Sequence, residues 1–238
     1  SNLNFKDIEI INDKKGMPKY AEKYSSGQMN GTHWVPAEVD VSIRPGWYYH
    51  PEQDDKVKSL KKLIDIYYES VGRNGSLLLN FPVDKRGLIH ENDIRQLQAM
   101  TKQIKVDFAH NLAQESKAST SSYRGKGYEA KRVLDGDKKT YWATADSVIQ
   151  ASLTIEFNQS TTFNRFLVQE YIQLGQRVKS FIVEARNDGA WREISRETTI
   201  GYKRILRFTD VTATAVRLKI LDSKACPTIS IVEIFYAP

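Results

Sequence analysis

The sequence predicts a multidomain chain in which an α/β segment precedes an all-β sandwich or jelly roll. In the first part, apolar residues alternate between strand-like and helix-like spacing. In the second part they follow a period of two, with no helical stretch between the strands. The change falls near Phe108–Asn111, so we expect one domain over residues 1–107 and another over residues 108–238.

The first part is predicted to contain two strands and two helices in alternation. Val39–Ile43 alternates as a strand, and apolar residues then recur at helical spacing as far as residue 72, with Asp54 or Asp55 as the expected helix cap. Ser76–Phe81 is a short apolar run, typical of a strand buried on both faces of a parallel sheet. Asn92–Val106 is again helical in pattern.

This alternation predicts a parallel α/β sheet or barrel. A complete (β/α)8 barrel needs roughly 200 residues or more, and the first part has only residues 1–107. We therefore expect either a small open sheet or the C-terminal portion of a (β/α)8-type barrel.

The second part has the pattern of seven or so short strands separated by turn residues such as Asn187–Gly189. This is typical of an antiparallel sandwich or jelly roll. The strand-like segments read QASLTIEF, FNRFLVQEY, VKSFIVEARND, WREISRE, KRILRFTDV, AVRLKILD and TISIVEIFY.

Composition excludes several classes of function. The net charge of +6 is not concentrated in a basic stripe, so nucleic-acid binding is not indicated. No run of 18 apolar residues predicts a membrane span, and SNLNFKDIEI lacks the pattern of a signal peptide. The single cysteine, Cys226, allows no internal disulfide bond.

One segment, WVPAEVDVSIRPGWYYH, combines aromatic rings with ionisable groups. Aromatic rings cover the C–H faces of a sugar, while carboxylate, guanidinium and imidazole groups bind its hydroxyls. A carbohydrate is therefore the ligand that these residue types fit best. The candidate substrate-binding residues are Trp34, Asp40, Arg44, Trp47 and His50.

Glu38 is the candidate catalytic residue in this segment. A carboxyl group among aromatic rings has its charged form disfavoured, which raises its pKa and suits a general acid for glycoside cleavage. The alternative is that the rings belong to a core and that Glu38 pairs with Arg44 at the surface.

The words WVPAEVDVSIRPGWYYH and DIYYESVGRNGSLLLNFPVDKRGLI closely resemble the C-terminal part of the catalytic barrel of α-L-fucosidases of glycoside hydrolase family 29, most of all the α-1,3/1,4-type branch. The resemblance covers residues 27–107 and implies that Glu38 is the general acid/base. It also places Trp47 in the lining of the site, and it implies a retaining mechanism.

A retaining mechanism also needs a nucleophilic aspartate, which the resemblance places upstream of residue 1. Asp40 is a poor substitute, because side chains two apart on one strand are about 7 Å apart, wider than the roughly 5–5.5 Å of a retaining pair. We expect Asp40 to bind a substrate hydroxyl or to orient Arg44.

Residues 110–238 resemble the discoidin-like, F5/8 type C sandwich, which also occurs as a carbohydrate-binding module. The resemblance implies a structural cation, usually Ca²⁺, beside the turn DGDKKTYW; the alternative is that Asp135 only caps this turn with Gly136. The implied ligands are the side chains of Asp135, Thr140 and Glu233 and the carbonyls of Arg132, Asp137 and Val232.

Together these resemblances imply a fragment of an exo-α-L-fucosidase that acts on fucosylated glycans, inactive by itself and without an organic cofactor. Family analogy implies a periplasmic or extracellular location. Two alternatives remain open: a non-catalytic carbohydrate-binding protein acting through the sandwich, and a structural adhesion module.

Overall fold

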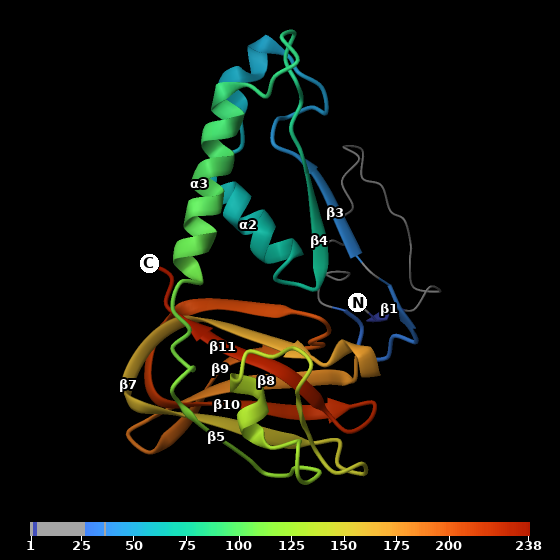
Figure 1. Ribbon diagram of the computed structural model, residues 1–238, viewed down its shortest axis with the longest axis vertical. Coiled ribbons are helices and arrows are strands. Elements are labelled where there is room, and N and C mark those ends of the chain that lie inside the picture. Colours follow the sequence, from blue (N-terminus) through green and yellow to red (C-terminus); the bar gives the residue numbers. More distant parts are fainter. Residues whose placement is uncertain (1, 4–26, 36) are drawn as a thin grey trace.

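The computed structural model describes residues 2–3, 27–35 and 37–238. It contains a small α/β part and a larger antiparallel β part, which lie one above the other along the longest axis of the molecule (Figure 1). None of the helices in the described ranges is long and apolar enough to cross a membrane.

The α/β part is built on two parallel strands, β3 (Ala37–Ser42) and β4 (Gly75–Asn80). Helix α2 (Leu60–Ser70) connects them, and helix α3 (Glu91–Asp107) follows β4. Both helices lie on one side of the strand pair (Figure 1). The predicted strand–helix–strand–helix order is therefore present, while the remainder of a barrel stays a prediction.

The start of the first helix differs from the prediction. Residues Pro51–Lys56 form a separate 3-10 helix, η2, and α2 begins only after Ser59, whose side chain accepts a hydrogen bond from the Lys62 amide at 3.4 Å. A serine hydroxyl satisfies a free helix amide as well as a carboxylate does. Asp54 is thereby left for another role.

The strand β4 is not buried on both faces, contrary to the prediction. Leu77 and Leu79 pack toward the helices with Leu63, while Leu78 on the opposite face is 53% exposed. The apolar run therefore has one face in the core and one face open.

The β part is a seven-stranded antiparallel sheet folded into a sandwich around one large core. Its strand order is β6-β11-β7-β10-β8-β9, with β5 paired to β7. The strands are β5 (Lys117–Thr120), β6 (Trp142–Ala143), β7 (Ala151–Glu170), β8 (Val178–Asn187), β9 (Ala190–Glu197), β10 (Arg204–Ser223) and β11 (Thr228–Phe235).

Two pairs of predicted strands are in fact single long strands. QASLTIEF and FNRFLVQEY both belong to β7, while KRILRFTDV and AVRLKILD both belong to β10. Register shifts interrupt the pairing of β7 with β10 at the polar residues between these segments. Such an irregularity bends a strand without ending it. The polar residues at the bend therefore looked like a turn between two strands.

The two parts share an apolar cluster. Tyr68 of α2 and Phe108 pack with Leu167, Ile205 and Phe235 of the sandwich. The Ile205 amide also donates to the Gly72 carbonyl at 2.8 Å. The sandwich therefore covers the end of the α/β part at which β3 and β4 begin.

Candidate functional site

The carboxyl ends of β3 and β4 bring together two loops at the end of the molecule distant from the sandwich (Figure 1). Asn80, the last residue of β4, joins them: its Nδ2 donates to the Ser42 hydroxyl at 3.1 Å and to the Trp47 carbonyl at 3.0 Å. The Ser42 hydroxyl in turn donates to the Gly46 carbonyl at 2.7 Å. In parallel α/β folds this end of the strands carries ligand-binding groups.

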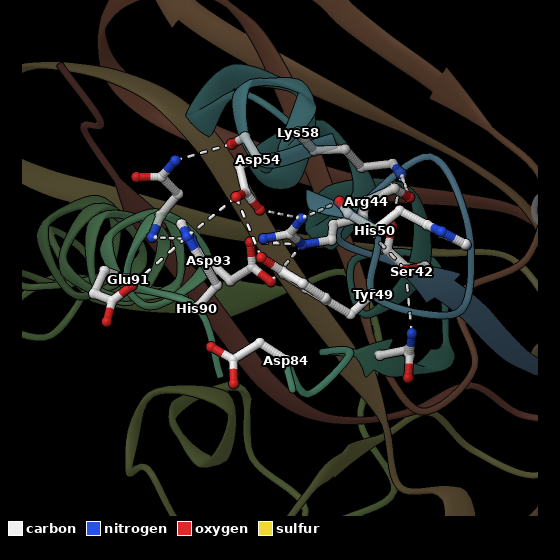
Figure 2. Close-up of polar contacts among 12 residues, drawn as sticks. Ser42, Arg44, Tyr49, His50, Asp54, Lys58, Asp84, His90, Glu91 and Asp93 are labelled. Atoms are coloured by element: carbon white, nitrogen blue, oxygen red, sulfur yellow. Dashed lines mark hydrogen bonds and ion pairs between the residues drawn. The ribbon is translucent and has the colours of Figure 1, made fainter. Parts of the chain in front are cut away.

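Arg44 lies directly beneath this loop and is 1% exposed. Its Nε donates to Asp93 Oδ2 at 2.8 Å and its Nη1 to Asp54 Oδ1 at 2.8 Å (Figure 2). Burial acts to lower the pKa of Arg44, but the hydrogen bonds to Asp93 and Asp54 outweigh it and raise the pKa above its ordinary value. The guanidinium is therefore charged and buried, and it links the end of β3 to η2 and α3.

This geometry corrects three expectations about Arg44. The residue is enclosed by protein groups, so it does not face a substrate. Its carboxylate partners are Asp54 and Asp93, so Asp40 does not orient it. The alternative of a surface pair with Glu38 is also wrong.

Sequence reasoning missed most of the residues around Arg44. The Tyr49 ring lies under the guanidinium at 4.9 Å, and its hydroxyl donates to Asp54 Oδ2 at 3.3 Å. His90 Nε2 is 3.4 Å from the same carboxylate oxygen. Asp93, in the first turn of α3, is completely buried, and a charged residue is rarely buried without a partner. The acidic residues at the start of this helix were the only feature of the sequence that could have indicated its role.

The predicted aromatic and histidine residues of the loop are exposed. Trp47 is 51% exposed, Tyr48 is 79% exposed and the His50 side chain is 52% exposed. Tyr48 was absent from the predicted site and has the largest exposed fraction of any large apolar residue in the described ranges. The loop therefore presents rings and an imidazole to the solvent at the carboxyl end of β3.

Glu38 and Asp40 occupy a different position. They share the open face of β3, as predicted, opposite Ser76 and Leu78 of β4. Glu38 is exposed and is not enclosed by rings in this chain, and Trp34 on β2 (His33–Trp34), which pairs with β1 (Asn2–Leu3), is 50% exposed. Glu38 is the second residue of β3, so it lies at the opposite end of the strand from Trp47.

The predicted cation ligands lie in the 3-10 helix η3 (Ala130–Leu134), in the turn that follows it and on β11. Asp135 Oδ2 accepts from the Thr140 hydroxyl at 2.7 Å, and Asp135 Oδ1 accepts from the Asp137 amide at 2.9 Å. Burial raises the pKa of Glu233 above its usual range. No group of three or more acidic, histidine or cysteine side chains suited to a metal occurs within the described ranges.

Three tyrosines outside the predicted set form a second cluster on the sandwich. The rings of Tyr141 and Tyr171 are stacked with centroids 4.3 Å apart and planes 17° apart, and Tyr128 lies 5.2 Å from Tyr141. All three rings are partly buried. They come from three separate loops, so their proximity follows only from the fold.

The architecture defines a class: proteins that join a parallel α/β segment to an antiparallel sandwich. Comparisons give this class a name. The α-L-fucosidase family model matches residues 3–108, and the F5/8 type C domain model matches residues 116–234.

Individual relatives agree with these matches. Alpha-L-fucosidase 1 of Arabidopsis thaliana is 37% identical over 92% of this chain and 43% of its own length. The fold is similar to that of a Ruminococcus gnavus GH29 fucosidase in complex with fucose, with a TM-score of 0.83 and 28% identity over 95% of this chain and 45% of that one. The chain spans less than half the length of the curated relatives it matches, at 42% and 43%.

The chain belongs to the α-L-fucosidase family of glycoside hydrolases (GH29) through its α/β part and to the F5/8 type C domain family through its sandwich.

Proposed function

We propose that this chain is part of an α-L-fucosidase that releases terminal α-L-fucose from glycans. The observation that carries the proposal is that the similarity to fucosidases runs through both parts in the same order, over 92% of the chain. A sandwich shared with unrelated proteins would match only residues 116–234. Fucosylated glycans are accordingly the proposed partners.

The proposed chemistry is hydrolysis with retention. A carboxylate attacks the anomeric carbon of fucose while a carboxylic acid protonates the departing oxygen, and the same acid later activates a water molecule that releases fucose. We assign the acid/base role to Glu38 on the strength of its place in the fucosidase word. Asp40 lies on the same face of β3 as Glu38 and is poorly placed to attack from another direction. We therefore assign the nucleophile to polypeptide upstream of residue 1, as the fucosidase resemblance implies.

One feature of the fold counts against Glu38. Catalytic groups of (β/α)8 barrels come from the carboxyl ends of the strands, whereas Glu38 is at the start of β3. Its open face next to Asp40 supports the role, since that face becomes the interior of a closed barrel. The variant Glu38→Gln therefore decides the assignment.

The test uses the full-length enzyme with two aryl α-L-fucosides, one with a good and one with a poor leaving group. If Glu38 is the acid/base, Glu38→Gln loses more activity on the poor leaving group than on the good one, and azide restores turnover by attacking the covalent intermediate to form α-L-fucosyl azide, with the configuration of the substrate retained. Asp40→Asn, on the same strand face, is the matched control and shows no azide rescue. Unselective loss without rescue would remove Glu38 from the chemistry and leave the fucosidase assignment intact.

The same assay tests the class of enzyme. Absence of α-L-fucoside hydrolysis by the wild-type full-length protein would refute the proposed function. The chain of residues 1–238 alone is expected to show no turnover, because it lacks the nucleophile. Turnover by this chain would place the nucleophile within it.

A second candidate function is carbohydrate binding by the sandwich. The stacked Tyr141–Tyr171 pair favours it, because flat rings suit the C–H faces of sugars. Binding of glycans to the sandwich that is lost in Tyr171→Ala would support this role. No binding to any fucosylated glycan would leave the sandwich as a purely structural partner of the α/β part.

We also propose that the DGDKKTYW turn holds Ca²⁺. Hard oxygen donors suit this ion, and a cation also neutralises a partly buried carboxyl such as that of Glu233, whose pKa burial raises. The carboxylates of Asp135 and Glu233 would hold the ion and fix the turn. Calcium should raise the melting temperature of the wild type, and chelation should lower it, with neither effect in Asp135→Ala.

A further inference from the structure

The loop between β3 and η2 has a rigid backbone although its surface is exposed. The carbonyls of Gly46 and Trp47 accept the bonds from Ser42 and Asn80 already described. At the other end, the His50 carbonyl accepts from the Gln53 amide at 2.9 Å. Both ends of the loop are therefore fixed to the strand ends and to the following helix.

The residue after Tyr48 is fixed in the same way. The Tyr49 ring is held between the Arg44 guanidinium at 4.9 Å and the His90 ring at 6.1 Å, with Asp54 on its hydroxyl (Figure 2). Tyr48 therefore stands between two immobilised neighbours, Trp47 and Tyr49. Its own ring points outward, with 79% of its surface exposed.

The buried ion pairs of Arg44 indicate that the loop after β3 has a role beyond stability. Burying an arginine with two carboxylates costs desolvation energy that an apolar core would avoid. Here the buried group supports a loop whose rings, Trp47 and Tyr48, are largely exposed. Rigid aromatic side chains lose little entropy on binding and so suit recognition. The desolvation energy spent on Arg44 therefore favours a preorganised binding surface on this loop.

The chemistry of the surface limits its ligand. Trp47 and Tyr48 supply flat apolar faces, and His50 beside Glu52, with Nδ1 to Oε1 at 3.6 Å, supplies hydrogen-bonding groups. None of these four side chains is a lysine or an arginine, the residues that usually bind anionic groups. A neutral pyranose, with C–H faces and hydroxyl edges, fits this set better than an anionic group does.

We propose that Tyr48 is a specificity residue that stacks on the sugar to which the fucose is attached, rather than on the fucose itself. This inference rests on the proposed fucosidase function. Its position supports it: Tyr48 lies on the loop that follows β3, at the strand end where (β/α)8 enzymes bind substrate, and its side chain is exposed. Arg44, Asp93 and Asn80 are positioning residues, which act on the ligand only through the loop.

The test compares two substrates of the full-length enzyme: a fucosylated oligosaccharide and an aryl α-L-fucoside, which lacks the second sugar. The measured quantity is the ratio of their kcat/KM values. In Tyr48→Ala this ratio should fall about tenfold, which corresponds to about 1.4 kcal/mol of lost stacking. In Tyr48→Phe, which keeps the ring, the ratio should stay close to that of the wild type.

Tyr123→Ala is the matched control, because Tyr123 is a similarly exposed tyrosine, at 55%, on the sandwich. It should leave the ratio unchanged. An unchanged ratio in Tyr48→Ala overturns the proposal. So does an equal loss on both substrates accompanied by a lower melting temperature, because Tyr48 would then pack against the rest of the enzyme. Failure of the wild type to hydrolyse either substrate instead refutes the fucosidase function itself.

Discussion

Arg44 and Asp93 form a completely buried ion pair that joins the end of β3 to the first turn of α3, with Nε to Oδ2 at 2.8 Å. The two residues are 49 positions apart in sequence. Their side chains have no exposed surface, so neither charge can be compensated by water if its partner is removed. This pair fixes the loop after β3, which carries the candidate binding surface, to the start of α3.

Removal of one partner is expected to be severely destabilising. Asp93→Ala should lower the free energy of unfolding by up to about 3–5 kcal/mol, because the buried Arg44 loses its fully buried partner and keeps only the partly exposed Asp54. Urea unfolding of this chain, followed by circular dichroism, measures the change. Arg86→Ala is the matched control: Arg86 also pairs with acidic groups, Asp84 and Glu91, but is exposed, and its removal should change stability little. Equal losses of stability in Asp93→Ala and Arg86→Ala would contradict the expectation that the buried pair matters more than the exposed one.

Tyr68 is expected to hold the two parts of the molecule together through its hydroxyl. The hydroxyl donates to Asp107 Oδ2 at 2.8 Å and accepts from Arg165 Nε at 2.9 Å, and the Arg207 guanidinium covers the ring at 4.5 Å. Tyr68→Phe removes one hydrogen bond from each partner, at Asp107 Oδ2 and Arg165 Nε, and should cost about 1–3 kcal/mol. Thermal unfolding monitored by calorimetry measures this loss.

Tyr67→Phe provides the comparison for Tyr68. Tyr67 is the preceding residue of α2 and packs in the same apolar cluster, but no hydrogen bond of its hydroxyl is found within the described ranges. Its substitution should shift the melting temperature much less. A larger shift for Tyr67→Phe than for Tyr68→Phe would show that packing, and not the hydroxyl, dominates the junction.

The two parts also meet at Gly201, and a methyl group there should separate them locally. A Cβ at Gly201 would lie 2.5 Å from Asn74 Nδ2, and φ at this glycine is +71°. Gly189 has a similar φ of +78° but open space around it, so Gly189→Ala has only the conformational cost of a left-handed alanine, about 1–2 kcal/mol. Gly201→Ala should destabilise the chain more than Gly189→Ala in urea unfolding. Equal losses would mean that the Asn74 side chain moves away freely.

Glu170 should make stability depend on pH between about 4.5 and 7. Burial raises the pKa of Glu170 to about 7, against the opposing effect of the Val178, Arg177 and Gly201 amides. Because the native state holds this proton more tightly than the unfolded state, the stabilising contribution is full below the unfolded pKa and is lost as the pH rises to about 7.

Unfolding free energies measured across this pH range should therefore fall toward pH 7 by a component that is absent in Glu170→Gln, which cannot ionise. The comparison concerns the slope, since the amide also alters the absolute stability through its hydrogen bonds to the loop amides. An identical slope in both proteins would show that Glu170 is ionised throughout.

Local sequence patterns determined much of the secondary structure and the order of the two parts. The helical period predicts the spacing of Leu60, Ile64 and Tyr67 in α2, which pack in its apolar cluster. The alternation in β3 and β8 follows from the period of a strand, because each pattern depends only on nearby residues. The words around Glu38 and Trp47 also led to the family. The sequence could not reveal that β7 and β10 are each continuous, since a bend and a turn use the same polar residues.

Only the tertiary structure decided which polar groups are used together. Arg44 looked like a ligand-binding residue because a sequence shows charge and not burial, and its partner Asp93 lies on a distant helix. Glu38 and Trp47 belong to one short segment of the sequence, and only the structure shows that they lie toward opposite ends of the extended strand β3. Burial and long-range pairing arise from the packing of segments that are far apart in the chain, which no local pattern encodes.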